Sequence, residues 1–235
     1  MRRLKESRCR PVYNRENEMK KAGLLQDYEG LARAGLENVA AAFSQMAGEE
    51  IIAVAPDLRM IPLAEIPALA GGPDTVVTAI YLAVSGDLSG HITLVLDMDS
   101  AARLAWLLLG VGEGVTDEVS SGSAALKGVP DMDPMMRSAL EEVGNVVGSA
   151  FLNTVADGLR VSLRPSIPYL VIDMAGAVLS TVVSRMEYSG ERIPLADAAF
   201  SSRQESIKGF LFILPDNEAL RYLKALTPGA GDLGG

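Results

Sequence analysis

The sequence contains very little cysteine and histidine. Cys9 is the single cysteine and His91 the single histidine among 235 residues. One cysteine cannot form an internal disulfide or a thiolate metal cluster, and one histidine excludes metal sites built from several imidazoles. The same scarcity argues against a Ser–His–Asp triad. The composition does not exclude metal sites built from Asp and Glu.

Aromatic residues and long apolar runs are also scarce. Aromatic side chains make up 5% of the chain, too few for the stacking platforms of proteins that bind single-stranded nucleic acid. The most apolar run, residues 101–111, is short and contains Arg103, whereas a membrane-spanning helix needs about 20 apolar residues. The basic N-terminus is not followed by the apolar segment of a secretory signal. We therefore expect a cytoplasmic protein.

The net charge of −9 is unevenly distributed. Residues 1–21 hold eight Lys and Arg against three Asp and Glu, so they carry +5 and the remainder carries −14. An acidic body repels nucleic acid and anionic lipid and favours a partner that presents lysines or a bound metal. Apolar residues make up 49% of the chain, enough for a hydrophobic core without disulfide or metal support.

Composition predicts one domain between two tails. Residues 1–15 are predicted to be a basic, disordered tail, with a docking arm as the alternative. Residues 111–133 contain Gly, Ser and Pro at intervals that break any period, so they are predicted to be a linker. Residues 227–235 are glycine-rich and predicted to be flexible. The domain between the tails spans residues 16–226, and the linker divides it into two parts.

Hydrophobic periodicity and turn residues predict alternating helices and strands in this domain. A long helix is expected from Glu16 to Ala47. Another helix, capped by Asp99 or Ser100, is expected to end at Leu109. The other expected elements are strands at 51–54, 60–62, 75–84, 91–97, 161–163 and within 187–214, and helices at 171–186 and from Asp216 to 226.

The centre of the second part is a predicted helix that starts near Pro134 and ends at Gly158. Its apolar residues return at three- and four-residue steps, as on one face of a helix. Ser138, Glu142 and Asn145 are spaced so that they form one polar stripe on this helix. A hydroxyl, a carboxylate and an amide in one stripe fit an active site, and they equally fit a solvated helix face.

The order of elements appears twice, in residues 16–110 and 134–226. Each part runs from a long helix through a proline to a hairpin and a closing helix, and Arg103 and Arg221 occupy matching places in the closing helices. A period of this length is longer than that of solenoid repeats and predicts a duplicated domain. We expect an α+β fold in which two halves related by a pseudo-twofold axis share one antiparallel sheet, with long helices packed on it.

The stripe belongs to a longer pattern, in which 22 residues separate Asn145 from Pro168. The pattern Ser138-x3-Glu142-x2-Asn145-x22-Pro168 resembles the signature of the CheC/FliY/CheX class of chemotaxis phosphatases. The run that starts Asp173-Met-Ala-Gly-Ala, the first-half segment 42–46 and the turn 85–90 are similar to CheC as well. The resemblance covers residues 24–226.

The resemblance implies dephosphorylation of the response regulator CheY. Asn145 would hold the attacking water and Glu142 would pair with a regulator lysine. Ser138 would be a supporting contact or a helix-start residue, and Pro168 would shape the loop beside the site. No cofactor or metal of its own is expected, because the regulator would bring the Mg²⁺.

The first half departs from the pattern. At the same offsets before Pro56 stand Gln26, Gly30 and Arg33. An arginine cannot accept a hydrogen bond from water, so this half-site is predicted not to hydrolyse phosphate.

The alternative is a binding module without enzymatic activity. The resemblance extends to the middle domain of the flagellar-switch protein FliM, which lacks the Glu-x2-Asn site. It also implies CheD as a partner, and a helix beginning near Asp173 is the expected contact.

Overall fold

The structure is a computed structural model that describes residues 13–54, 58–110, 132–184, 192–202, 206–219 and 221. The helices are α1 (Tyr13–Ala47), α2 (Ile66–Leu69), α3 (Met98–Leu109), α4 (Pro134–Leu159) and α5 (Ala175–Ser184), with a 3-10 turn η1 (Leu63–Glu65) before α2. The strands are β1 (Ile52–Val54), β2 (Leu58–Pro62), β3 (Val76–Gly86), β4 (Gly90–Asp97), β5 (Leu163–Pro165), β6 (Tyr169–Met174), β7 (Arg192–Ser201) and β8 (Ser206–Pro215).

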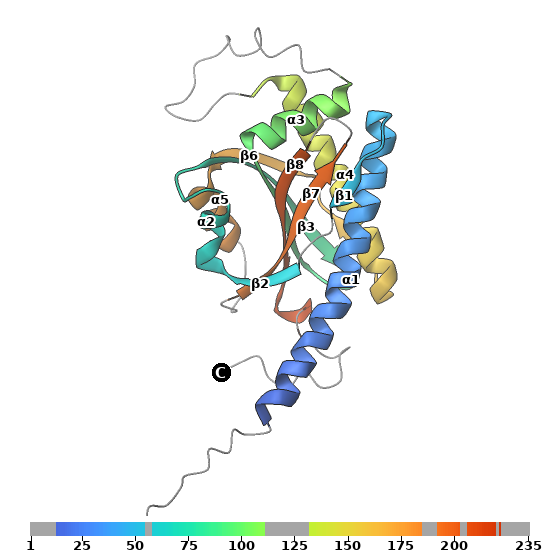
Figure 1. Ribbon diagram of the computed structural model, residues 1–235, viewed down its shortest axis with the longest axis vertical. Helices are drawn as coiled ribbons and strands as arrows, with labels where there is room; N and C mark the ends of the chain where they lie inside the picture. Colours follow the sequence, from blue (N-terminus) through green and yellow to red (C-terminus); the bar gives the residue numbers. More distant parts are fainter. Residues whose placement is uncertain are drawn as a thin grey trace, which may run out of the picture.

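The strands of the described residues form one eight-stranded sheet (Figure 1). Its order is β1–β7–β8–β4–β3–β5, with β2 also paired to β7 and β6 also paired to β3. All of these pairs are antiparallel. The predicted α+β class with an antiparallel sheet under long helices is therefore confirmed.

The two halves of the chain contribute equivalent elements. One half runs α1–β1–β2–α2–β3–β4, and the other runs α4–β5–β6–α5–β7–β8. The short strands of each half pair with the long hairpin of the other, β1 and β2 with β7, and β5 and β6 with β3. The β4–β8 pair joins the halves at the centre of the sheet. This arrangement is what a duplication would produce, and the duplication itself stays a prediction.

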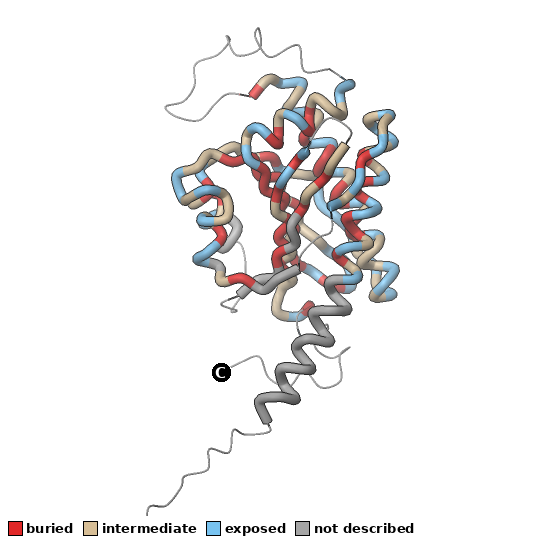
Figure 2. The backbone as a smooth tube through the Cα atoms, in the orientation of Figure 1, coloured by how far each residue is buried: buried red, intermediate tan, exposed pale blue. Residues whose placement is uncertain are grey.

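The sheet carries helices on both faces. Figure 1 shows α1 and α4 on one side, α2 and α5 on the other, and α3 across one end. The larger core lies under α1, α3 and α4 and includes Leu36, Phe43, Ile80, Leu140 and Phe151. The smaller core lies under α2 and α5. In Figure 2 the buried residues follow the strands and the inward sides of the helices, so burial of apolar faces holds the layers together.

The start of α3 corrects one prediction. The capping residue is Asp97, whose carboxylate accepts a hydrogen bond from the backbone N–H of Ser100 at 2.6 Å. Asp97 still has extended backbone angles, as the last residue of β4, and its side chain therefore reaches the third residue of the helix. Asp99 and Ser100, the predicted caps, lie inside the first turn.

The predicted helix over residues 171–186 is wrong in its first part. Residues 169–174 form strand β6, which pairs with β3 from Tyr81 to Val76. The helix begins only at Ala175. A short apolar run is compatible with either structure, and pairing with a distant strand decides for the sheet.

Several predictions lie outside the described residues. These are residues 1–12 of the tail predicted at 1–15, most of the predicted linker and the tail at 227–235, so the domain boundaries stay predictions. Residues 13–15 of the predicted tail are helical, because α1 already begins at Tyr13 and not at Glu16. Asp216 accepts a hydrogen bond from the N–H of Ala219 at 2.7 Å, as expected for the cap of the last helix. Among the described residues, no helix has the length and apolarity that crossing a membrane requires.

Candidate active site

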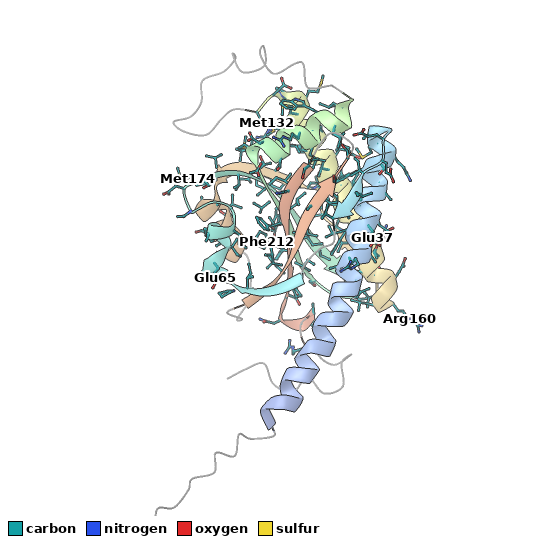
Figure 3. The ribbon with its side chains drawn as sticks, viewed as in Figure 1. Glu37, Glu65, Met132, Arg160, Met174 and Phe212 are labelled. Carbon is teal, nitrogen blue, oxygen red and sulfur yellow. The ribbon has the colours of Figure 1, made fainter. Side chains whose placement is uncertain are left out.

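The site is built on helix α4, whose first turn is fixed by a capping residue. Asp133 accepts hydrogen bonds from the N–H groups of Met135 at 2.8 Å and Met136 at 3.4 Å. Pro134 occupies the first turn, where its missing N–H costs no hydrogen bond. Figure 3 labels Met132, just before the helix, and Arg160, just after it.

The end of α4 differs slightly from the prediction. The helix continues to Leu159 and ends at Arg160, which has a positive φ of 58°. Gly158, the predicted end, lies in the last turn and faces α1. A Cβ at Gly158 would overlap with Leu31 Cδ2, so this glycine permits close packing of the two long helices.

The structure places all three predicted polar residues on the solvent side of α4. Ser138, Glu142 and Asn145 are exposed. The opposite side is buried against the sheet, α1 and α3, through residues Leu140, Val143, Gly144, Val147, Gly148, Phe151 and Leu152. The stripe is therefore accessible to a macromolecule, and it is anchored on a helix whose other side is held in the core.

Glu142 and Asn145 contact each other directly. The Asn145 Nδ2 donates a hydrogen bond to Glu142 Oε2 at 2.9 Å. The two residues are three apart and thus neighbours on the helix surface. The bond uses one of the two N–H donors of the amide and leaves the carbonyl oxygen Oδ1 of this exposed residue as an acceptor. The pair therefore presents one oriented acceptor next to one negative charge.

Two glycines bring the helix close to the edge of the sheet. A Cβ at Gly144 would lie 2.6 Å from Pro168 Cβ and 2.7 Å from Ile80 Cγ2. At Gly148 it would lie 2.8 Å from Leu82 Cδ2. Only glycine allows this approach, since real Cβ atoms do not come that close. Pro168 thus packs against the helix at the residue before Asn145, in agreement with its predicted place beside the site.

Ser138 is not a helix-start residue. Asp133 provides the cap, and Ser138 lies one turn further along the helix, four residues before Glu142. Its hydroxyl is on the exposed side. Of the two roles expected for Ser138, only that of a supporting contact is compatible with this position.

The first-half positions lie on α1. Gly30 and Arg33 are exposed, and Gln26 lies in the same helix, with its side chain outside the described ones. The helices α1 and α4 pack side by side, and Asn38 Nδ2 donates to Thr154 Oγ1 at 2.8 Å between them. Nothing in this arrangement tests the inactivity of the first half, which stays a prediction.

Asp173 does not begin a helix. It lies on β6 opposite Val77, and one of its carboxylate oxygens accepts a hydrogen bond from the N–H of Met174 at 2.7 Å. Helix α5 starts two residues later. A partner could still contact this corner, but the contact would include the end of a strand.

Carboxylates do not gather into a metal site in the described part of the chain. No group of three or more His, Cys, Asp or Glu side chains is close enough there to hold a metal ion. Glu142 has an amide as its hydrogen-bond partner. The chemistry that these residues can do is to accept a hydrogen bond at Asn145 and to pair with a cation at Glu142.

The sequence analysis did not identify the two glycines of α4 that pack against the turn between β5 and β6. Gly144 and Gly148 are four residues apart and so share one side of a helix. This spacing next to the polar stripe was available in the sequence as a signal for close packing. Their partners Pro165, Pro168 and Leu82 could not be identified, because those contacts depend on the tertiary fold.

Comparison with known proteins gives relatives in sequence and in structure. No family model matches the chain. The chain is 27% identical over 191 residues to the CheY-P phosphatase CheC of Bacillus subtilis, which covers 80% of this chain and 86% of that protein. It is also 27% identical over 195 residues to the CheC1 protein of Halobacterium salinarum, covering 83% of this chain and 91% of the other.

Solved structures share the fold. FliY of Thermotoga maritima aligns with a TM-score of 0.67 at 14% identity, over 90% of this chain and 97% of FliY. The FliM middle domain of H. pylori aligns with a TM-score of 0.58 at 10% identity, over 86% of this chain and 97% of that domain. At these identities the likeness concerns the fold alone. Together with the sequence matches, it confirms the predicted resemblance to CheC-type proteins: the chain is similar in sequence to CheC and shares its fold with FliY and the FliM middle domain.

Proposed function

We propose that this protein hydrolyses the aspartyl phosphate of a CheY-type response regulator, using Glu142 and Asn145. The observation that supports the proposal is the exposed pair on α4, in which Asn145 Nδ2 donates to Glu142 Oε2 at 2.9 Å. The similarity to the CheY-P phosphatase CheC supports the choice of substrate. The fold alone does not distinguish this function from a binding role, because the FliM middle domain has the same fold.

The reaction needs little from the protein. An aspartyl phosphate is an activated acyl phosphate, so water can attack phosphorus directly. The water oxygen forms a bond to phosphorus, the bond between phosphorus and the aspartate oxygen breaks, and both water protons end on the released phosphate. The aspartate leaves as a carboxylate. What remains to be supplied is a water held in line with the leaving oxygen, and positioning is a large part of catalysis in phosphoryl transfer.

Asn145 is suited to hold this water. Its Oδ1 accepts a hydrogen bond from the water, and its Nδ2 is already held by Glu142. A neutral amide can approach the phosphoryl group, whereas a carboxylate at this position would be repelled by the phosphoryl charge. The buried side of α4 fixes the backbone from which Asn145 projects. The amide is therefore pre-oriented before the regulator binds.

Glu142 has two roles in this proposal. Its Oε2 orients Asn145, and its exposed negative charge attracts a lysine of the regulator. A charge-assisted bond of this kind fixes the register in which two proteins dock. By the family resemblance, a Mg²⁺ carried by the regulator offsets the phosphoryl charge. Pro168 supports the helix at Gly144, and Ser138 extends the contact surface.

The test compares Asn145→Ala with a matched variant, Asn153→Ala. Asn153 is an exposed asparagine on the same helix, eight residues further along. With a phosphorylated CheY-type regulator as substrate, Asn145→Ala should lower kcat by about a hundredfold or more, the scale of lost positioning. Asn153→Ala should match the wild type. Equal rates for all three proteins would refute the assignment of Asn145.

A binding module is the other outcome of the same experiment. A wild-type protein that binds the regulator, or recovers CheD in a pull-down, without accelerating phosphate loss would favour it. Asp173 at the end of β6 is then the first residue to substitute for the CheD contact.

A further inference from the structure

Two exposed apolar side chains that are not part of the core lie near the polar stripe on α4. Met135 is 63% exposed in the first turn of α4, while its neighbour Met136 packs against the larger core. Ile167 is 89% exposed in the turn between β5 and β6. Exposing a large apolar side chain gives up burial energy, and two of them beside one candidate site are available to contact a partner.

Ile167 is held on a rigid support. The backbone N–H of Ser166 donates to the carbonyl of Ala83 at 2.8 Å, and the Ala83 N–H donates to Ser166 Oγ at 3.0 Å. The same hydroxyl donates to the carbonyl of Ile167 at 3.0 Å. On the other side, Pro168 packs against α4 at Gly144. The turn that presents Ile167 is therefore fixed to both β3 and α4 before any partner arrives.

A standard protein interface around Asn145 is large enough to reach both Met135 and Ile167. A standard interface covers about 800 Å² on each partner, which as a disc has a radius of about 16 Å. Met135 precedes Asn145 by ten residues, a distance of about 15 Å along a helix. Ile167 is next to Pro168, which contacts the residue before Asn145. A regulator whose interface is centred on Asn145 therefore reaches the region of both side chains.

We propose that Ile167 and Met135 are docking residues for the phosphorylated regulator, which would meet them with apolar surface beside its phosphorylation site. This inference rests on the proposed function, because the position of Asn145 fixes where the regulator sits. In this arrangement a central polar pair handles the phosphate and a lysine, and apolar contacts on two sides supply affinity. Neither side chain touches the reacting atoms, so both act on binding.

The test measures binding and turnover separately for Ile167→Ser, Met135→Ser and the control Ile52→Ser. Ile52 is also exposed, at 55%, but lies on β1 at the other end of the sheet. Binding is measured with the regulator carrying beryllofluoride and Mg²⁺ as a phosphoryl mimic. Ile167→Ser should raise Kd about tenfold, the scale of a well-buried contact residue. Met135→Ser should raise Kd in the same direction, and Ile52→Ser should leave it unchanged.

Turnover separates this inference from the function on which it rests. At saturating phosphorylated regulator, kcat of Ile167→Ser and Met135→Ser should stay within about twofold of the wild type, since only docking is weakened. If these variants bind as Ile52→Ser does while Asn145→Ala has lost activity, the docking surface is wrong and the proposed function stands. If Asn145→Ala keeps full activity, the proposed function fails. Unchanged melting temperatures exclude misfolding as the cause of weaker binding.

Discussion

Replacing Glu142 by Gln and by Ala separates the two roles that we propose for this residue. Glu142 Oε2 accepts the hydrogen bond from Asn145 Nδ2 at 2.9 Å. A glutamine keeps an acceptor oxygen at nearly the same place but has no charge. An alanine removes both the acceptor and the charge. The two variants therefore test orientation and docking independently.

The expected magnitudes follow from the exposure of the pair. An exposed ion pair contributes up to about 1 kcal/mol, so Glu142→Gln should raise KM about fivefold and leave kcat within about twofold. A hydrogen bond contributes about 1 kcal/mol net. Its loss in Glu142→Ala frees the amide to rotate and should lower kcat about fivefold, in addition to the same rise in KM.

The assay is phosphate release from a phosphorylated regulator across a range of regulator and salt concentrations. The KM of the wild type should rise with ionic strength, because salt screens an exposed charge pair, and the KM of Glu142→Gln should respond less. Glu141→Ala is the control, since Glu141 is an exposed carboxylate on the adjacent position of the same helix. Identical kcat values for the Gln and Ala variants would refute the orienting role of Glu142.

Two further predictions concern stability. Gly144→Ala should lower the free energy of unfolding by about 1–3 kcal/mol, the cost of overpacking, because the new Cβ would lie 2.6 Å from Pro168 Cβ. At Gly30 no atom of the described residues lies within 4 Å of an added Cβ, so Gly30→Ala should instead stabilise α1 by about 0.5–1 kcal/mol. A loss of stability in Gly30→Ala equal to that in Gly144→Ala would contradict the packing argument. Thr93→Val should raise the free energy of unfolding by about 1 kcal/mol, since the buried Thr93 Oγ1 has no hydrogen-bond partner among the described residues and valine has nearly the same shape. Denaturant titration measures all three, and a destabilised Thr93→Val would show that the hydroxyl is satisfied.

Much of the fold could be predicted from local signals. The long helices and the hairpin of β3 and β4 follow from hydrophobic periodicity and from the turn residues between the strands. The stripe of Ser138, Glu142 and Asn145 also follows from spacing on one helix, and the hydrogen bond between Glu142 and Asn145 is a local contact of this kind.

The parts that could not be predicted depend on distant contacts. Strand β6 is a short apolar segment, and its pairing with β3 brings together residues about 90 positions apart. The approach of Pro168 to Gly144 likewise exists only once the sheet has formed. The cap of α3 is Asp97 and not the predicted Asp99 or Ser100, because Asp97 lies at the end of β4 and has the extended backbone that a cap requires.

The most direct test of the central claim is the rate of phosphoaspartate loss in a regulator saturated with this protein. Saturation removes docking from the measurement and leaves only the step in which Asn145 is proposed to hold the water. The account predicts that Asn145→Ala still binds the beryllofluoride-loaded regulator, and that the phosphoaspartate then decays at the rate of the regulator alone. A saturated Asn145→Ala complex that loses phosphate as fast as the wild-type complex would contradict it.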